Sequence, residues 1–160
     1  MPIAVARIDQ RMIHGIVVNQ WFAHLQPKRY MVVDDLVSQD EVQKAAMRLS
    51  KPTGTGMSII NTEKAIQNFK NGNYDSQKVF LIVRQPETII RFLEEGIEIP
   101  RVDLGIMFDA EGKEKISKFI SLTEKEKDEL ETIKRLGVPV FVKYVPDDQD
   151  VPYSSSLVYK

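Results

Sequence analysis

Four ionisable side chains lie close together near the start of the chain, in the segment RIDQRMIHGIVVNQW: Arg7, Asp9, Arg11 and His14. A simple turn is usually built from glycine, proline, asparagine or another short polar residue, so this charged set needs a different explanation. A neutral histidine has a free ring nitrogen that can attack phosphorus. The forked guanidinium of arginine matches phosphoryl oxygens. The segment therefore predicts phosphoryl chemistry on His14.

The position of His14 favours the same chemistry, because Gly15 is the expected first residue of a helix. The positive end of a helix favours a bound phosphate and disfavours an imidazolium. Arg11 is predicted to bind the phosphoryl oxygens, and Arg7 to add a second positive charge. Asp9 has the wrong sign for phosphate, so we expect it either to hold Arg11 or to fix the tautomer of the histidine ring.

The elements that must position this segment alternate between β-rich runs and amphipathic runs. Strands are predicted at 3–8, 29–34, 56–61, 77–84, 102–107, 115–122 and 138–145, and helices at about 15–25, 38–50, 62–72, 86–96 and 123–137. This alternation predicts an α/β fold, with an open, mostly parallel sheet of about seven strands and helices on both faces. Ligands of such sheets bind outside the carboxyl ends of the strands, where the His14 segment is expected.

Local signals refine these elements. Ser38 with Glu41 and Thr123 with Glu126 have the spacing of capping boxes at helix starts. The apolar run at 79–83 predicts the central strand of the sheet. Residues 1–160 are expected to form one domain, with 146–160 as a loosely held tail.

Composition excludes several classes of protein. With 22 Lys and Arg against 23 Asp and Glu, the net charge is -1, which argues against a nucleic-acid binder. No cysteine is present, which excludes disulfides, thiolate nucleophiles and cysteine-ligated metals and fits a reducing cytosolic setting. The apolar run VFLIV is far shorter than the roughly 20 residues of a membrane span, so no direct membrane insertion is expected. No metal or other cofactor is expected.

The segment RIDQRMIHGIVVNQW resembles the R-I-D-D-R-L-I-H-G-Q-V signature of IIB subunits in the mannose, fructose and sorbose family of the bacterial phosphoenolpyruvate-dependent sugar phosphotransferase system. Counterparts of VVDDLVSQDEVQKA, KPTG, VRQPE, DLGIMFDAEGKEKIS and SLTEKE follow in the same order. The chain departs from the family pattern at Gln10, Ile16 and Gly105-Ile106-Met107. These changes leave the histidine and its arginines in place.

This resemblance implies a phosphotransferase with an α/β sandwich fold. His14 would accept a phosphoryl group from a phosphohistidine of a IIA partner. It would pass the group to a hexose or hexose derivative, of the mannose, fructose, sorbose or N-acetylgalactosamine type, that enters through the membrane subunits IIC and IID. Arg11 would stabilise the transferring group, while Asp9 and Arg7 shape the loop. The subunit would be cytoplasmic and peripherally associated with the transporter, and His14 would lie in a shallow, exposed site that two partners reach.

Two other hypotheses remain at this point. A histidine phosphatase also uses a histidine after a strand, but it carries arginine directly before that histidine, where this chain has Ile13. It also needs a second histidine, and His24 follows within the same predicted helix. His24 is predicted to be packed or exposed rather than bound to a metal. The other hypothesis is a regulatory module in which the motif serves only as a docking surface.

Other polar segments are predicted to have structural roles. Asp34 and Asp35 end a strand, but no G-x-G-x-x-G motif accompanies them, so a loop or helix-start role is expected. KPTGTG leads into a strand and lacks the ending of a phosphate loop, which predicts a turn that borders the active loop. Arg84 and Gln85 leave a strand at the carboxyl edge and can approach His14, although an exposed helix start is the simpler interpretation.

Overall fold

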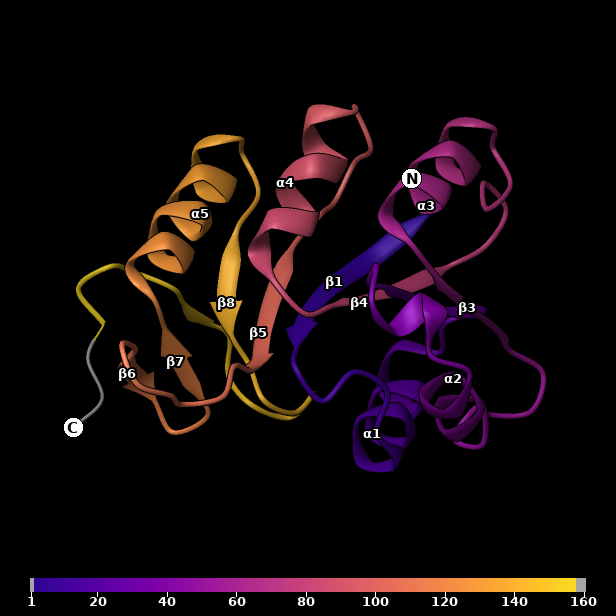
Figure 1. Ribbon diagram of the computed structural model, residues 1–160, viewed down its shortest axis with the longest axis horizontal. Coiled ribbons are helices and arrows are strands. Elements are labelled where there is room, and N and C mark those ends of the chain that lie inside the picture. Colours follow the sequence, from indigo (N-terminus) through magenta and orange to yellow (C-terminus); the bar gives the residue numbers. More distant parts are fainter. Residues whose placement is uncertain (1, 158–160) are drawn as a thin grey trace.

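Seven strands form one sheet in the order β3-β2-β4-β1-β5-β8-β9 (Figure 1). The computed structural model describes residues 2–157, except for the side chains of Ile16 and Val17. All neighbouring strands are parallel except β8 and β9. The strands are β1 (Ile3–Asp9), β2 (Arg29–Val33), β3 (Gly56–Ile60), β4 (Val79–Val83), β5 (Val102–Ile106), β8 (Val140–Val142) and β9 (Val151–Pro152).

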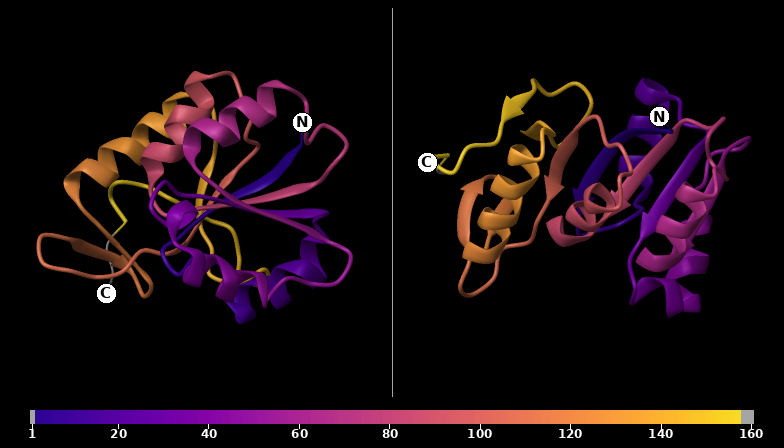
Figure 2. Two further views of the ribbon diagram at one scale, coloured as in Figure 1. Left: turned by 45° about the vertical axis from the view of Figure 1, so that its right-hand side comes forward. Right: turned by 90° about the horizontal axis from the view of Figure 1, so that it is seen from above.

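Helices cover both faces of this sheet, as Figures 1 and 2 show. One face carries α1 (Gly15–Leu25) and α2 (Glu41–Arg48), which follows the short 3-10 helix η1 (Val37–Gln39). The other face carries α3 (Thr62–Lys70), α4 (Pro86–Glu94) and α5 (Glu124–Arg135). Two hydrophobic clusters fill the layers on either side, so the predicted α/β class is confirmed. None of the helices in the described part of the chain is long and apolar enough to cross a membrane.

The predicted strand at 115–122 is two strands. β6 (Glu114–Ser117) and β7 (Ile120–Leu122) form an antiparallel hairpin outside the main sheet. The seventh strand of the main sheet is β9, which lies in the segment predicted to be a loose tail. Tyr153, which follows β9, is 2% exposed and belongs to the larger hydrophobic cluster. The last three residues, which the tail prediction also covers, lie outside the described part.

Of the two predicted capping boxes, one is confirmed and one is wrong. Thr123 and Glu126 form the predicted capping box at α5. The predicted box of Ser38 and Glu41 is wrong, because Asp40 caps α2 by accepting hydrogen bonds from Val42 N and Gln43 N. The carboxylate of Asp40, two residues after Ser38, satisfies the unpaired N–H groups in the first turn of α2.

The course of the chain creates a switch point beside β1. β1 and β4 are neighbours, both fully or largely buried, although β1 rather than β4 is the middle strand of the seven. The chain leaves β1 through α1 toward β2 and leaves β4 through α4 toward β5, on the opposite face. The carboxyl ends of these two strands therefore mark the place at the sheet edge where ligands bind in open α/β sheets.

Candidate functional site

The loop after β1 places His14 on the surface at the start of α1. Its side chain is exposed, and its carbonyl accepts the first helical hydrogen bond, from Val18 N at 3.0 Å. Met12 anchors the loop from below: it is 2% exposed and has a φ of 64°. A non-glycine residue in this conformation costs of the order of 1 kcal/mol or more, so the packing of Met12 in the smaller hydrophobic cluster has to stabilise it. No glycine or asparagine in the sequence signals this turn.

Asp9, the last residue of β1, holds Arg11. Its fully buried carboxylate accepts hydrogen bonds from Arg11 N at 3.0 Å, Arg11 Nε at 3.1 Å and Arg11 Nη2 at 2.8 Å. It also accepts one from Arg7 Nε at 3.2 Å. Of the two roles that the sequence left open for Asp9, these contacts favour holding Arg11 over orienting the histidine ring.

Arg7 lies beneath the loop, with no exposed side-chain surface. Besides Asp9, it donates Nη1 to the carbonyl of Lys143 at 2.8 Å and Nη2 to the carbonyl of Tyr144 at 2.6 Å. Its guanidinium also lies 5.3 Å from the centre of the Trp21 ring. Burial lowers the pKa of Arg7, while the carboxylate of Asp9 opposes that shift. These contacts place its charge behind Asp9, where it joins β1 to the loop after β8.

Arg11 is the arginine that reaches the surface beside this loop, with 16% of its side chain exposed. Burial by itself lowers its pKa, but hydrogen bonds and charge from Asp9, assisted by Tyr144, outweigh that effect and raise the pKa above the ordinary value. Arg11 is therefore a fixed cation. Its guanidinium lies 5.3 Å from the centre of the Tyr144 ring, which in turn stacks on Phe119 at 4.1 Å. Sequence reasoning missed both aromatic residues, although Tyr144 follows a strand at the carboxyl edge.

Gly105 in β5 leaves space for the buried guanidinium. A Cβ at this position would overlap the Arg7 side chain. Changing Gly105 to alanine is expected to lower the free energy of unfolding by about 1–3 kcal/mol, because the overpacked arginine must shift from its carbonyl partners. Urea denaturation would measure this change. Gly15→Ala is the matched control, because a Cβ there meets nothing within 4 Å; an equal loss in both variants would contradict the interpretation.

Comparison with known proteins shows the family of this chain. The family model described as the sorbose subfamily IIB component of the PTS system matches residues 3–160. The chain belongs to this family. The N-acetylgalactosamine-specific phosphotransferase enzyme IIB component 1 of Escherichia coli K12 is 36% identical over 148 residues, covering 92% of this chain and 93% of the relative. The mannose-specific EIIAB component of E. coli K12 is 30% identical, and the match covers 92% of this chain but 46% of that protein.

Solved structures agree with this assignment. The crystal structure of the IIBSor domain of the sorbose permease from Klebsiella pneumoniae has a TM-score of 0.90 and 29% identity, covering 94% of this chain and 93% of that domain. The N-acetylgalactosamine-specific IIB component 1 from E. coli has a TM-score of 0.89 and 35% identity, covering 95% and 99%. The chain is thus a sugar-specific IIB component of the phosphotransferase system. Such components are phosphotransferases in sugar transport that work with IIA and with the membrane components IIC and IID.

Gln10, where this IIB component departs from the usual signature, ties the His14 loop to the next loop of the sheet. Its Oε1 accepts a hydrogen bond from Phe108 N at 2.7 Å, and its own N donates to Ile106 O at 2.9 Å. The amide therefore replaces an acidic residue with a neutral acceptor at the same edge. The side chain of Ile16, the second departure, lies outside the described part.

The other polar segments have structural partners. Asp34 accepts from Val37 N at 2.9 Å, and Asp35 accepts from Thr62 N at 2.8 Å, as expected of loop and helix-start residues. Arg84 makes one long ion pair with Asp34, at 3.4 Å. KPTGTG precedes β3 and so lies at the amino edge of the sheet; the expectation that it borders the active loop is wrong, because a turn that enters a parallel strand is at the opposite edge from one that leaves it.

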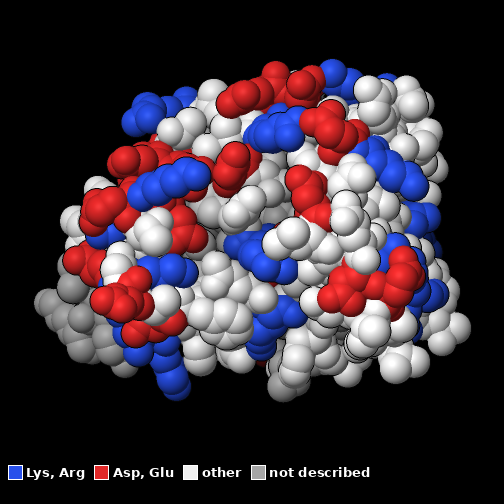
Figure 3. Space-filling model, in the orientation of Figure 1, with Lys and Arg blue, Asp and Glu red and all other residues white. Residues whose placement is uncertain are grey.

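His24 is exposed on α1, with its ring edge-on to Trp21 at 6.0 Å. Within residues 2–157 there is no group of three or more histidine, aspartate and glutamate side chains that could hold a metal ion. On the face shown in Figure 3, acidic groups gather over α4 and α5 and again at the lower right, and basic groups lie in the middle between them.

Proposed function

We propose that this IIB component carries a phosphoryl group on His14. The group comes from a phosphohistidine of a IIA component and goes to a hexose or hexose derivative that enters through IIC and IID. The observation that supports this most is the exposed His14 at the start of α1, in the same loop as Arg11, whose guanidinium is held by the buried carboxylate of Asp9.

In the first step, a ring nitrogen of His14 attacks the phosphorus atom as the N–P bond to the IIA histidine breaks. The donor histidine leaves as a neutral ring. Charge spreads over the three equatorial oxygens of the transferring group, where a fixed cation and the positive end of α1 lower the energy of the transition state. In the second step, a sugar hydroxyl attacks the same phosphorus atom, the N–P bond to His14 breaks so that His14 leaves as a neutral ring, and the hydroxyl proton passes to solvent.

Two partners must reach the same atom in this scheme. The exposure of the His14 side chain meets that requirement, because partners can reach an exposed side chain from solvent. The EIIAB relative supports a IIA partner, because its name joins an A and a B component in one protein. We further propose that this component acts in the cytoplasm, peripherally associated with the membrane subunits through these contacts.

The histidine phosphatase hypothesis gains no support from the site. Ile13, directly before His14, is buried at 7% exposure and carries no charge. His24 lies on the exposed side of α1 and contacts Trp21 rather than the loop. A phosphatase would also release inorganic phosphate steadily from a small phosphomonoester, which separates the two functions in one assay.

The proposed function is tested by phosphorus NMR. The protein is incubated with phosphoenolpyruvate, the general phosphotransferase proteins and a IIA partner encoded beside it. We expect an acid-labile, alkali-stable phosphoimidazole signal, whose shift also identifies the phosphorylated nitrogen. If IIA remains phosphorylated and binds this protein while no phosphate is transferred, the carrier function is wrong and the docking-module hypothesis replaces it.

Changing Arg11 to alanine is expected to slow phosphoryl transfer to His14 by about 10²-fold, because a preorganised charge at the transferring group is lost. Arg11→Lys should recover only part of the rate, since an ammonium lacks the fork that both Asp9 and a phosphoryl group can accept from. Rapid-quench measurement of labelled protein would give the rates. Arg135→Ala, at the far end of α5, is the control and should transfer at the normal rate.

A further inference from the structure

The loop that joins β8 to β9, residues 143–150, brings an aromatic ring to Arg11 from far along the sequence. The hydrogen bonds from Arg11 to Asp9 involve Nε and Nη2 and fix one edge of the guanidinium. The same guanidinium lies over the Tyr144 ring, with the Arg11 Cζ 5.3 Å from the ring centre. A guanidinium that is hydrogen-bonded along one edge and lies against an aromatic ring has little freedom to rotate. We propose that Tyr144 is a positioning residue for phosphoryl transfer, holding Arg11 in the orientation that the transferring group requires; this rests on the proposed function.

Tyr144 is itself held from three sides. Its carbonyl accepts the Arg7 Nη2 hydrogen bond at 2.6 Å, and its N donates to Asp148 Oδ2 at 3.1 Å. Its ring stacks on Phe119 at 4.1 Å and an interplanar angle of 21°. Phe119 lies between β6 and β7, so the hairpin outside the main sheet supports the ring from behind. Because the Tyr144 ring is restrained in this way, it limits the movement of the Arg11 guanidinium that lies over it.

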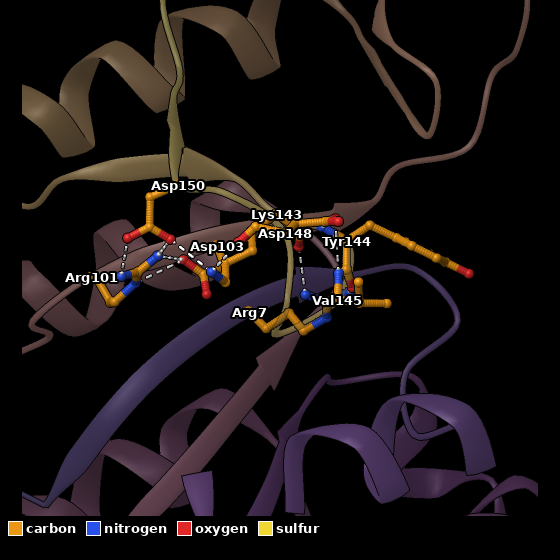
Figure 4. A network of polar contacts seen from close by, with 8 residues as sticks. All are labelled: Arg7, Arg101, Asp103, Lys143, Tyr144, Val145, Asp148 and Asp150. Atoms are coloured by element: carbon orange, nitrogen blue, oxygen red, sulfur yellow. Dashed lines mark hydrogen bonds and ion pairs between the residues drawn. The ribbon is translucent and has the colours of Figure 1, made fainter. Parts of the chain in front are cut away.

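A polar network fixes the loop that carries Tyr144, as Figure 4 shows. Lys143 Nζ donates to the carbonyl of Asp148 at 2.7 Å and to Asp150 Oδ1 at 2.8 Å. Asp150 also accepts from Arg101, whose Nη2 donates to the buried Asp103 at 2.7 Å. Hydrogen bonds from Arg101, followed by those from Lys143, lower the pKa of Asp150. The loop is therefore tied to β5 at one end and to Arg7 at the other.

The start of this loop, at Lys143 and Tyr144, thus lies against Arg7 and Arg11. Arg7 donates hydrogen bonds both to the carboxylate of Asp9, which also accepts from Arg11, and to the carbonyl of Tyr144. The ring of Tyr144 lies against the Arg11 guanidinium. One buried side chain therefore sets the distance between the two groups that orient Arg11. In this proposal, Arg7 and the loop of residues 143–150 therefore act together to orient the Arg11 side chain.

The test compares Tyr144→Leu with Tyr144→Phe. Phosphoryl transfer from the IIA half of the E. coli mannose-specific EIIAB component, or from a genomically linked IIA, is measured at several IIA concentrations. Tyr144→Leu is expected to lower the maximal rate about tenfold, with little change in the KM for IIA, because a misplaced group loses rate rather than binding. Tyr144→Phe keeps the ring and should stay within about twofold of the normal rate. Tyr144 is half-buried, so both variants should fold, which thermal unfolding would verify.

A second readout is independent of transfer. The Nε–H resonance of Arg11 in a proton–nitrogen spectrum should exchange slowly with water in the normal protein and in Tyr144→Phe, and faster in Tyr144→Leu. The control is Tyr74→Leu, which removes a ring 5.5 Å from Arg29 at the amino edge of the sheet and should leave both readouts unchanged.

The outcomes separate the two proposals. If the normal protein accepts phosphate while Tyr144→Leu keeps its rate and its Arg11 resonance, the positioning role is wrong. A raised KM with an unchanged maximal rate would also overturn it, because Tyr144 would then be a docking contact for IIA. If the normal protein accepts no phosphate, the proposed function fails, and the Arg11 resonance still tests whether Tyr144 orders that side chain.

Discussion

Changing His14 to alanine is expected to abolish acceptance of a phosphoryl group from IIA, by roughly 10³-fold or more. The ring nitrogen is the nucleophile in the proposed reaction, and loss of a nucleophile removes the covalent route rather than slowing it. The side chain is exposed, so the variant should unfold at the normal temperature. Transfer of labelled phosphate to the purified variant, followed by gel analysis at neutral pH, would measure the loss.

The chain provides a matched control in its second histidine. His24 lies on the same helix, is also exposed and has no place in the proposed reaction. His24→Ala should therefore accept phosphate at the normal rate. If His14→Ala were labelled as well as the normal protein, or if His24→Ala lost its label, phosphate would be carried elsewhere and the assignment to His14 would be wrong.

Changing Arg7 to methionine is expected to lower the free energy of unfolding by about 3–5 kcal/mol. Methionine fills much of the space but removes the cation, so the buried carboxylate of Asp9 loses one of its two partners. The carbonyls of Lys143 and Tyr144 also lose the donors that they accept from. Urea denaturation followed by the fluorescence of Trp21, which lies over the guanidinium, would report both the stability and the local environment.

Arg84→Met is the matched control for this change. Arg84 follows the neighbouring strand β4, and its side chain is 37% exposed and makes one long ion pair, at 3.4 Å, with Asp34. Exposed pairs of this kind contribute about 0–1 kcal/mol. The Arg84 variant should therefore unfold almost normally. Equal stability of Arg7→Met and the normal protein would show that the buried contacts of Arg7 do not hold the two loops together.

Much of the fold follows from signals that are local in the sequence. The apolar run of β4, Pro86 at the first turn of α4 and the Thr123–Glu126 capping box are each set by residues within a few positions of one another. Local periodicity and capping depend on those neighbours, so they can be read from the chain. The location of His14 at a strand-to-helix turn follows in the same way.

Two errors in the predicted strands arise because those strands depend on partners far away in the sequence. Residues 115–122 alternate partially, like one strand, yet they fold back as a hairpin that contacts Met107. β9 has only two residues, Val151–Pro152, and it exists because β8 offers an open edge. The capping error at α2 is local instead: Ser38 lies inside the short helix η1, and Asp40 directly precedes α2, so the carboxylate of Asp40 accepts from the first turn.

The sequence by itself determined the class of fold and singled out His14 and Arg11 as candidate site residues, because the residues of that motif are close together in the chain and their chemistry is intrinsic. Only the tertiary structure decided that Arg7 is buried behind Asp9 and that Tyr144, 133 positions after Arg11, covers its guanidinium. The physical reason is that parallel strands bring their carboxyl ends together through long crossovers. Which loops then meet at that edge depends on strand order, and no local pattern specifies that order.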